Sequence, residues 1–364
     1  MVHNFSPGPA AIYKEVLLKA QKELLDYNGT HYSLLEASHR SAMYQDLHQQ
    51  ARDTFLQLLD LDDSYQVLLL SGGATLQFAM LAYNLLGAGS TADYIVTGAW
   101  GEKAYEDAVK VAKGKTEVKV FRHAEHAKYT ITPAPHTVQL HSSSAYVHIT
   151  SNETIQGLQW KEDPQFRDAS IPVLADMSSD ILSRRRNFAS YGLIYAGAQK
   201  NIGTSGLTVL LIRKDLLSQS QEALPSYLSY KKHATAHSLY NTPPVFSVWV
   251  FKLVLDHIIS IGGLEAVESM NQKKAEALYE AVDSSNGFYT CPVKKAYRSD
   301  MNVVFTLPST DLEDKFIAMA GEHGIIGIRG HRSVGGCRAS LYNAVSLANV
   351  EALVACMHAF RRKH

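Results

Sequence analysis

The spacing of hydrophobic and polar residues predicts two helices early in the chain and a regular alternation of strands and helices after them. Residues 13–27 and 45–59 carry apolar side chains at helical spacing, with Leu47, Ala51 and Phe55 on one face of the second segment. From residue 65 onward, short runs rich in Val, Ile and Leu alternate with further helical segments. The runs predicted as strands are 65–70, 93–97, 117–121, 145–149, 171–175, 191–196 and 207–212. Such runs indicate a mostly parallel, seven-stranded sheet that is covered by helices on both faces.

The pattern changes after a long apolar helix that is predicted to run from Val245 to Ser260. Beyond it, helical spacing predominates and strands become rare. The segments predicted there are helices over 265–282, 312–323 and 349–362 and a strand over 302–306. A chain of 364 residues exceeds the size at which one core usually stops growing, so two domains are expected. We predict an α/β protein with a large domain over residues 13–260 and a smaller C-terminal α+β domain over residues 261–364.

The composition fits a globular enzyme and argues against several other classes. Lys and Arg together number 35, as do Asp and Glu, and this balance argues against nucleic acid or an acidic membrane surface as a partner. No apolar run approaches the roughly 20 residues of a membrane span, and the first residues lack a signal-peptide pattern. The 16 histidines, His123 and His126 among them, show no convincing metal-ligand set, so no metal site is expected. Three cysteines without paired spacing predict a reducing compartment, and we expect a cytoplasmic protein.

The candidate chemistry begins with an acid and a lysine that each follow a predicted strand. Asp176 comes directly after the apolar run over 171–175, and Lys200 lies in a Gly- and Ser-rich stretch over 195–206. A buried carboxylate requires a cationic partner, which is either a protonated ring nitrogen or a nearby arginine. A lysine among small residues is confined enough for a lowered pKa, although most loop lysines are simply solvated. Together the two residues suggest pyridoxal phosphate, whose aldehyde forms a Schiff base with lysine and whose pyridine nitrogen an acid can hold protonated.

Three further segments at strand ends fit the same cofactor, and each also has an ordinary structural explanation. The turn over 71–75, with two glycines ahead of a helix, would bind a phosphate, but a tight strand-to-helix turn has the same pattern. Trp100, flanked by glycines at 98 and 101, would stack on a pyridine ring, and the alternative is a core tryptophan. Thr154 would bind a ring hydroxyl, and the alternative is a capping residue.

Basic residues concentrate in one Gly-rich segment over 327–340 and in two shorter places. The basic residues of that segment are Arg329, His331, Arg332 and Arg338. Planar guanidinium groups bind carboxylates and phosphates with paired hydrogen bonds, so the segment is predicted to bind an anionic substrate. A basic surface loop is the alternative, and it is most plausible for Arg329. His39 and Arg40 form a second basic pair, and the three arginines over 184–186 are interpreted as a solvated or phosphate-adjacent turn.

Taken together, these segments resemble the phosphoserine aminotransferases, which are class V members of the fold-type I pyridoxal-phosphate enzymes. The resemblance runs nearly from end to end. Its motifs lie at residues 4–10, 38–41, 72–75, 97–100, 195–201, 240–244, 330–336 and 338–340. It implies a fold-type I large domain, a small domain that also includes residues 1–12, a homodimer, and pyridoxal 5′-phosphate as cofactor. The sequence departs from the family pattern at Thr75, where some members have an arginine, and over 184–187, which lacks the usual proline.

The resemblance also implies a role for each candidate residue. Lys200 would be the Schiff-base lysine, and Asp176 would pair with the ring nitrogen. Trp100 would stack on the ring, and Thr154 would contact its hydroxyl. The residues expected to hold the cofactor phosphate are Ala74, Thr75 and Gln199, together with Asn241 and Thr242 from the partner subunit. The residues expected to bind substrate are Arg338 for the α-carboxylate, and Arg40, His331 and Arg332 for the distal phosphate or the glutamate side chain.

The implied reaction is a ping-pong transamination between L-glutamate and 3-phosphohydroxypyruvate that gives O-phospho-L-serine and 2-oxoglutarate in serine biosynthesis. Lys200 would move the proton at Cα as general base and acid. The family also allows 4-phosphohydroxy-L-threonine, an intermediate of pyridoxine biosynthesis, as a second substrate. Two rival functions stay open at this point. One is a cysteine desulfurase with Cys337 as nucleophile, and the other is a regulatory protein whose basic segment binds an anionic partner such as RNA.

Overall fold

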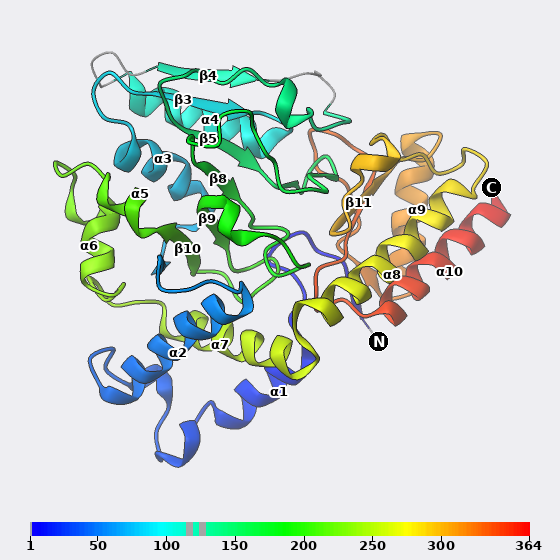
Figure 1. Cartoon of the computed structure of the whole chain (residues 1–364). Helices are drawn as coiled ribbons and strands as arrows, with labels where there is room; N and C mark the ends of the chain where they lie inside the picture. Colours follow the sequence, from blue (N-terminus) through cyan, green and yellow to red (C-terminus); the bar gives the residue numbers. More distant parts are fainter. Residues whose placement is uncertain (1, 114–118, 124–128) are drawn as a thin grey trace.

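A seven-stranded sheet with the order β2-β10-β9-β8-β5-β3-β4 forms the centre of the larger part of the molecule (Figure 1). The computed structural model describes residues 2–113, 119–123 and 129–364. Its sheet strands are β2 (Tyr65–Leu70), β3 (Thr91–Ile95), β4 (Lys119–His123), β5 (Ser144–Thr150), β8 (Val173–Asp176), β9 (Tyr191–Gly197) and β10 (Thr208–Arg213). Only β10 runs antiparallel to its neighbours in this sheet. The predicted mostly parallel seven-stranded sheet is therefore confirmed.

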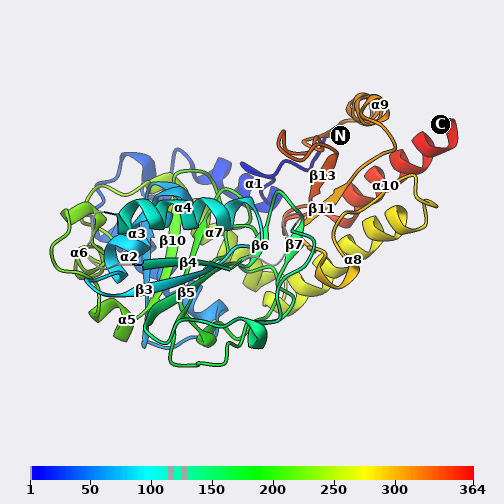
Figure 2. The same ribbon diagram turned by 90° about the horizontal axis from the view of Figure 1, so that it is seen from above.

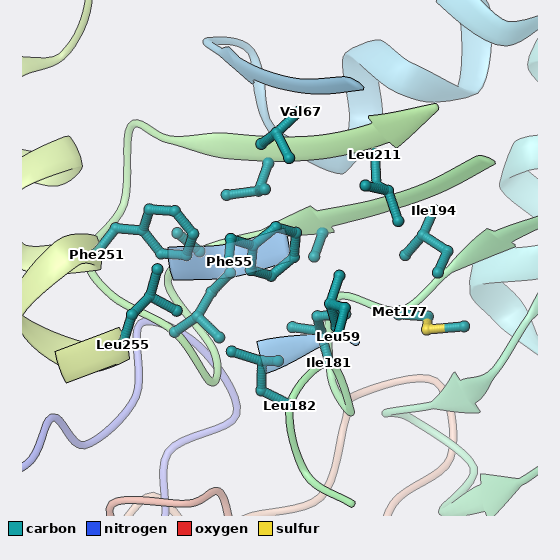
Figure 3. Packing of buried hydrophobic residues seen from close by; sticks show 14 of the residues in the cluster. Phe55, Leu59, Val67, Met177, Ile181, Leu182, Ile194, Leu211, Phe251 and Leu255 are labelled. Carbon is teal, nitrogen blue, oxygen red and sulfur yellow. The ribbon is translucent and has the colours of Figure 1, made fainter. Parts of the chain in front are cut away.

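Helices cover both faces of the sheet, as the alternation of the strand residues requires. Val67 and Leu69 of β2 lie in one apolar cluster, whereas Leu68 and Leu70 lie in a second cluster on the opposite face. The helices that pack on the first face are α2 (Ala42–Leu58) and α7 (Val245–Ser260), and those on the second are α3 (Gly73–Leu85) and α4 (Ala99–Ala112). Figure 3 shows Phe55 of α2 and residues of α7 packed against strand side chains.

The smaller part of the molecule has its own apolar cluster and lies beside the sheet (Figures 1 and 2). Its elements are α8 (Gly263–Asp283), β11 (Asn302–Phe305), α9 (Thr310–Glu322), β12 (Ile325–Ile326), β13 (Cys337–Ser340) and α10 (Leu347–Lys363). The N-terminal strand β1 (His3–Asn4) pairs with β12, and Phe5 enters the same cluster. These contacts support our proposal that residues 1–12 and 261–364 form a domain distinct from residues 13–260.

The remaining elements are short or peripheral. They are α1 (Lys14–Glu23), α5 (Lys214–Ser218), α6 (Tyr230–Thr235), β6 (Asn152–Glu153) and β7 (Leu158–Gln159). No single described helix is long and apolar enough to span a membrane; α7 and α8 reach the required length and composition only as a pair, and that pair is bent by 86°.

The sequence-based boundaries differ from the structure in two places that matter for the site. The helical spacing predicts a helix over 102–112, but the helix found there, α4, begins at Ala99, so Trp100 lies inside its first turn. The Gly-rich segment contains strand β13, which pairs antiparallel with β11 and was not predicted. Residues 117 and 118 of the strand predicted over 117–121 lie outside the described residues, and so do the placements of the His123 and His126 side chains.

Candidate active site

Lys200 lies in the turn that follows β9, at the edge of the sheet where the parallel strands end. Its Nζ atom donates a hydrogen bond of 2.9 Å to Oγ1 of Thr154, which follows β6. In the sheet register, Tyr195 of β9 pairs with Asp176, and Asp176 pairs with Thr150 of β5. The ends of three neighbouring strands thus bring the lysine, the acid and the threonine to one edge, which is where ligands bind in open α/β sheets.

Asp176 is the last residue of β8 and is only 5% exposed. Its Oδ1 atom accepts a hydrogen bond of 2.8 Å from the backbone N–H of Ser178. Burial raises the pKa of this carboxyl group, and the nearby amine of Lys200 acts in the opposite direction. Within the described residues no arginine forms an ion pair with Asp176, so the arginine alternative raised by the sequence is not observed.

The amine of Lys200 is held in a setting that favours its neutral form. Burial lowers the pKa of Lys200, while the carboxyl groups of Asp176 and Glu153 oppose this effect. A lowered lysine pKa increases the fraction of neutral amine near pH 7, which is the form that acts as nucleophile and base. The lowered pKa fits the confined setting that the small neighbours of Lys200 predicted, and the role of the amine stays a prediction.

Trp100 lies next to this amine, on the first turn of α4. The Nζ atom of Lys200 is 5.3 Å from the centroid of the indole ring, and Nζ of Lys103 is 4.4 Å from it. The ring is half-buried, so it is not a core tryptophan, and its Nε1 atom is buried without a hydrogen-bond partner. A flat ring close to the lysine, with an unpartnered donor, is suited to stacking on a second flat ring.

The sequence analysis missed Glu153, which is fully buried beside Trp100. Its two carboxylate oxygens accept hydrogen bonds from the backbone N–H groups of Trp100 (3.0 Å) and Gly101 (2.9 Å). Burial raises the pKa of Glu153 to about 7, although both hydrogen bonds lower it. The sequence signal was a carboxylate four residues after the run over 145–149, and only its neighbour Thr154 was singled out.

Arg338 lies on β13 and is 5% exposed. Its Nη1 atom is 3.4 Å from the carbonyl oxygen of Thr154, and its Nε atom is buried without a partner. Because a buried cation with an unpartnered donor is costly, this arrangement favours the binding of an anion. Burial lowers the pKa of half-buried His331, and the positive charges of Arg338 and Arg332 act in the same direction. Arg329 instead forms a 2.8 Å surface ion pair with Asp314.

The turn before α3 places a second set of candidate groups at the same edge. Gly72 and Gly73 have φ values of 103° and 69°, which only glycine adopts readily, and a Cβ atom on Gly72 would lie 2.4 Å from Leu76. The N-cap of α3 has no side-chain hydrogen bond, and Ala74 and Thr75 follow it in the first turn. Backbone N–H groups at such a helix start bind anions.

The structure does not bring every predicted residue to Lys200 within one chain. Gln199 precedes the lysine and is half-buried, and its carbonyl oxygen accepts a hydrogen bond from the N–H of Ala10. Arg40, Asn241 and Thr242 are exposed. In the part of the chain that the structure describes, none of these three forms a hydrogen bond or ion pair with Lys200, Asp176 or Trp100.

The interpretation of the three arginines over 184–186 as a solvated turn was wrong for two of them. The side chain of Arg186 is 1% exposed and pairs with Asp180 at 2.5 Å, and Arg184 donates to the carbonyl oxygens of Trp160 and Lys161. Arg185 alone is exposed. The sequence could not reveal this, because the compensating carboxylate lies in a different turn of the chain.

Cys337 cannot serve as the accessible nucleophile of a desulfurase. It is fully buried in the apolar cluster of the smaller part, and burial raises the pKa of its thiol to about 12. A reactive cysteine requires exposure and a lowered pKa. Among the described residues, no group of three or more His, Cys, Asp or Glu side chains is arranged to hold a metal ion.

Comparisons with known proteins show the family to which the chain belongs. A sequence model of the family Aminotransferase class-V matches residues 2–353. Phosphoserine aminotransferase from Geobacillus kaustophilus is 49% identical over 361 residues, which cover 99% of this chain and 98% of the relative. Phosphoserine aminotransferase 2, chloroplastic, from Arabidopsis thaliana is 46% identical and covers 100% of this chain and 85% of its own.

Solved structures give the same result. Phosphoserine aminotransferase from Bacillus circulans subsp. alkalophilus superposes with a TM-score of 0.94 at 45% identity and covers 100% of this chain and 99% of its own. The pyridoxal-phosphate-bound phosphoserine aminotransferase from Trichomonas vaginalis has a TM-score of 0.93 at 34% identity and covers 98% and 100% of the two chains. By sequence along its whole length and by fold, the chain belongs to the phosphoserine aminotransferase family of class-V aminotransferases.

Proposed function

We propose that this protein transfers the amino group of L-glutamate to 3-phosphohydroxypyruvate, giving O-phospho-L-serine and 2-oxoglutarate in serine biosynthesis. One arrangement supports the proposal. The amine of Lys200 has a lowered pKa and lies at the strand ends where Asp176 also lies. Thr154 contacts this amine through its hydroxyl group and the Arg338 guanidinium through its carbonyl oxygen. The relatives that bear the name phosphoserine aminotransferase match the chain over its whole length.

The residues around Lys200 fit pyridoxal phosphate. The uncapped first turn of α3, at Ala74 and Thr75, suits its phosphate, and the half-buried ring of Trp100 suits stacking on its pyridine ring. The buried carboxyl group of Asp176 suits a protonated ring nitrogen. When bound, this cofactor supplies an aldehyde that combines with amines and a ring that withdraws electrons from the substrate Cα.

Each side chain then has a defined task. The neutral amine of Lys200 takes the proton from Cα of the substrate and later returns it, as general base and acid. The hydroxyl of Thr154 holds that amine in place, because the two atoms are hydrogen-bonded at 2.9 Å. The carboxylate of Asp176 would stabilise a proton at the ring nitrogen of the cofactor. Gln199 lies beside the lysine and would contribute to holding the cofactor phosphate.

The basic residues would orient the substrate. The buried guanidinium of Arg338, with its unpartnered Nε, would bind the α-carboxylate. His331 and Arg332, with Arg40, would bind the distal phosphate or the side chain of glutamate. Two charge-assisted contacts to phosphate contribute roughly 3–6 kcal/mol, which predicts a preference of about 10²–10⁴ for O-phospho-L-serine over L-serine.

We propose a homodimer, because an apolar face and two candidate residues are left exposed in one chain. The large apolar side chains exposed on α1 and in the segment after it are Leu17, Leu18, Leu24, Leu25, Tyr32 and Leu35, and Leu25 is 82% exposed. Asn241 and Thr242 are exposed as well. Exposed large apolar side chains gathered in one stretch of the chain are typical of an interface. A second copy would cover it and place Asn241 and Thr242 against the cofactor phosphate of its neighbour.

Two narrower parts of the proposal concern range and location. 4-Phosphohydroxy-L-threonine carries the same α-carboxylate, amino group and distal phosphate as O-phospho-L-serine, so we propose it as a second substrate, linking the enzyme to pyridoxine biosynthesis. All three cysteines are free, and two of them are buried, which supports a reducing compartment such as the cytoplasm.

The proposal is tested by titrating the protein, loaded with pyridoxal phosphate, with O-phospho-L-serine and separately with L-serine. We expect the visible absorption of the lysine-bound cofactor to be lost at a concentration of the phosphorylated compound about 10²–10⁴ times lower. Equal responses to both compounds would contradict the substrate assignment but keep the cofactor. If the protein gains no visible absorption after incubation with pyridoxal phosphate, the assignment of Lys200 is wrong.

A further inference from the structure

Glu153 is a fully buried carboxyl group that none of the tasks above uses. It ends β6, and its two oxygens accept hydrogen bonds from the first-turn N–H groups of Trp100 and Gly101 in α4. Glu153 lies more than 50 positions from the two residues that it caps. Helices are usually capped by the residue that directly precedes them. The contact therefore joins two separate elements of the site.

The chain is shaped to admit this carboxyl group. The carboxyl group of Glu153 can approach the first turn of α4 only because residue 98 is glycine. A Cβ atom at that position would lie 2.3 Å from Cδ of Glu153. Gly98 has a φ of 177°, which any residue adopts, so backbone conformation does not require glycine at this position. The requirement comes from the packing of Glu153 itself.

The dipeptide formed by Glu153 and Thr154 contacts three groups of the proposed site. Glu153 holds the backbone of Trp100, the hydroxyl of Thr154 accepts from Lys200, and the carbonyl oxygen of Thr154 faces Arg338. A shift of this dipeptide would move the stacking ring, the reactive amine and the carboxylate-binding group relative to one another. Fixing it is therefore a way to fix the geometry of the reaction.

We propose that Glu153 is a positioning residue, which holds the indole of Trp100 in place beside Lys200 through the first turn of α4. The proposal rests on the proposed function for the reaction in which turnover is measured. A carboxylate is needed because it offers an acceptor to each of two N–H groups, whereas an amide offers one acceptor and turns its own N–H₂ toward the other donor. The charged groups that face Glu153 are Asp176 and Lys200.

The test uses Glu153→Gln, with Gln156→Ala as the matched control. Oε1 of Gln156 accepts from the N–H of Ala99 at 3.3 Å, so the control removes a cap from the same helix end without touching the bond to Trp100. The near-ultraviolet circular dichroism of cofactor-free protein reports the setting of Trp100, with Trp100→Phe defining its share of the spectrum. This readout is independent of any reaction.

We expect Glu153→Gln to reproduce most of the spectral change of Trp100→Phe and to lower kcat about a hundredfold, with KM for L-glutamate changed less than about threefold. Gln156→Ala is expected to change kcat less than about threefold. Because Glu153 acts through Trp100, the double variant should be little worse than Trp100→Phe alone. An unchanged spectrum, or kcat losses that multiply in the double variant, would overturn the proposal.

Two further outcomes keep the test decisive. If Glu153→Gln does not fold, Gly98→Ala takes its place, since the added methyl group displaces the carboxyl group while the backbone accepts alanine; normal kcat in that variant would contradict the proposal. If the parent protein itself fails to convert O-phospho-L-serine, the proposed function is wrong, and the circular dichroism of the cofactor-free variants still decides the role of Glu153.

Discussion

Helices α3 and α4 begin at the same edge of the sheet, directly after β2 and β3, yet their N-termini are used differently. Both N-cap residues are glycines, Gly72 and Gly98, and neither supplies a side-chain cap. The first N–H groups of α4 are taken by side chains of Glu153 and Gln156. No side-chain oxygen among the described residues accepts from Ala74 or Thr75 of α3.

The difference shows how one backbone arrangement serves two purposes. A helix start with free N–H groups attracts anions, and the first turn of α3, which has no side-chain cap, suits the phosphate that we propose for it. At α4 the carboxylate of Glu153 already fills that position, so a second anion there would meet a buried acid. The same geometry then positions the ring of Trp100 instead of binding a ligand. Lys200 lies close to this ring, with its Nζ atom 5.3 Å from the ring centroid.

Lys200→Ala should have the largest effect, because it should abolish turnover while leaving the binding of pyridoxal phosphate largely intact. We expect kcat to fall by more than about 10⁴-fold, because the proton at Cα loses its base and acid. Pyridoxal phosphate should still bind without a covalent link, since α3 holds its phosphate. Stopped-flow kinetics and equilibrium dialysis measure the two effects. The comparison variant Lys103→Ala removes the other amine over the same ring and should lower kcat by less than about tenfold. Near-normal turnover by Lys200→Ala would contradict the role of Lys200 as base and acid.

Much of the fold and part of this contrast could be predicted from the sequence, because both depend on local patterns. Apolar runs fixed the strands, and α7 was predicted with the bounds Val245–Ser260 that it has. Lys200 and Asp176 were found because each follows an apolar run, and parallel strand ends meet at one edge. The family resemblance assigned roles that geometry alone does not, and all of these roles, those of Arg40, Asn241 and Thr242 included, stay predictions.

The features that the sequence analysis missed depend on how the folded chain packs, even where the partner is only six residues away, as Asp180 is from Arg186. Glu153 caps a helix that begins 54 positions earlier, at Ala99, and Arg186 is neutralised by Asp180 inside a fold that the local pattern does not describe. The sequence pattern did not predict β13, because glycines precede it and no apolar run marks it. Its pairing with β11 is what makes it a strand. In each case burial is decided by a tertiary neighbour, and single-residue patterns carry no record of that neighbour.

Arg186→Met tests whether the chain around Asp176 depends on a buried ion pair. Arg186 pairs with Asp180, Asp180 accepts from the hydroxyl of Ser151, and that hydroxyl also donates to the carbonyl oxygen of Asp176. Removing one partner leaves a buried charge, so the free energy of unfolding should fall by about 3–5 kcal/mol. Urea denaturation measures it. Arg185→Met, which removes an exposed arginine next to it, should change it by less than about 1 kcal/mol.

Ala74→Asp would convert the open helix end of α3 into a filled one like that of α4. A carboxylate in the first turn competes for the free N–H groups and repels phosphate, so the Kd for pyridoxal phosphate should rise about 10²–10³-fold. Ala74→Asn, with the same size and no charge, should raise it by clearly less. Fluorescence titration of cofactor-free protein gives both constants. Equal affinities in the two variants would show that the phosphate does not bind at α3.

The pH dependence of stability tests the contrast between the two helix ends at α4, through the titration of Glu153. The pKa of Glu153 is about 7 in the folded protein against an ordinary 4.5, so the folded state keeps this proton after the unfolded state has released it. Stability therefore falls as pH rises from about 4.5 to about 7, by at most about 3 kcal/mol from this group. Glu153→Gln lacks this loss. The unfolding free energy of this variant minus that of the parent should rise across that pH window and level off above it. Urea denaturation at a series of pH values measures this difference. A difference that does not change with pH would mean that Glu153 stays ionised throughout.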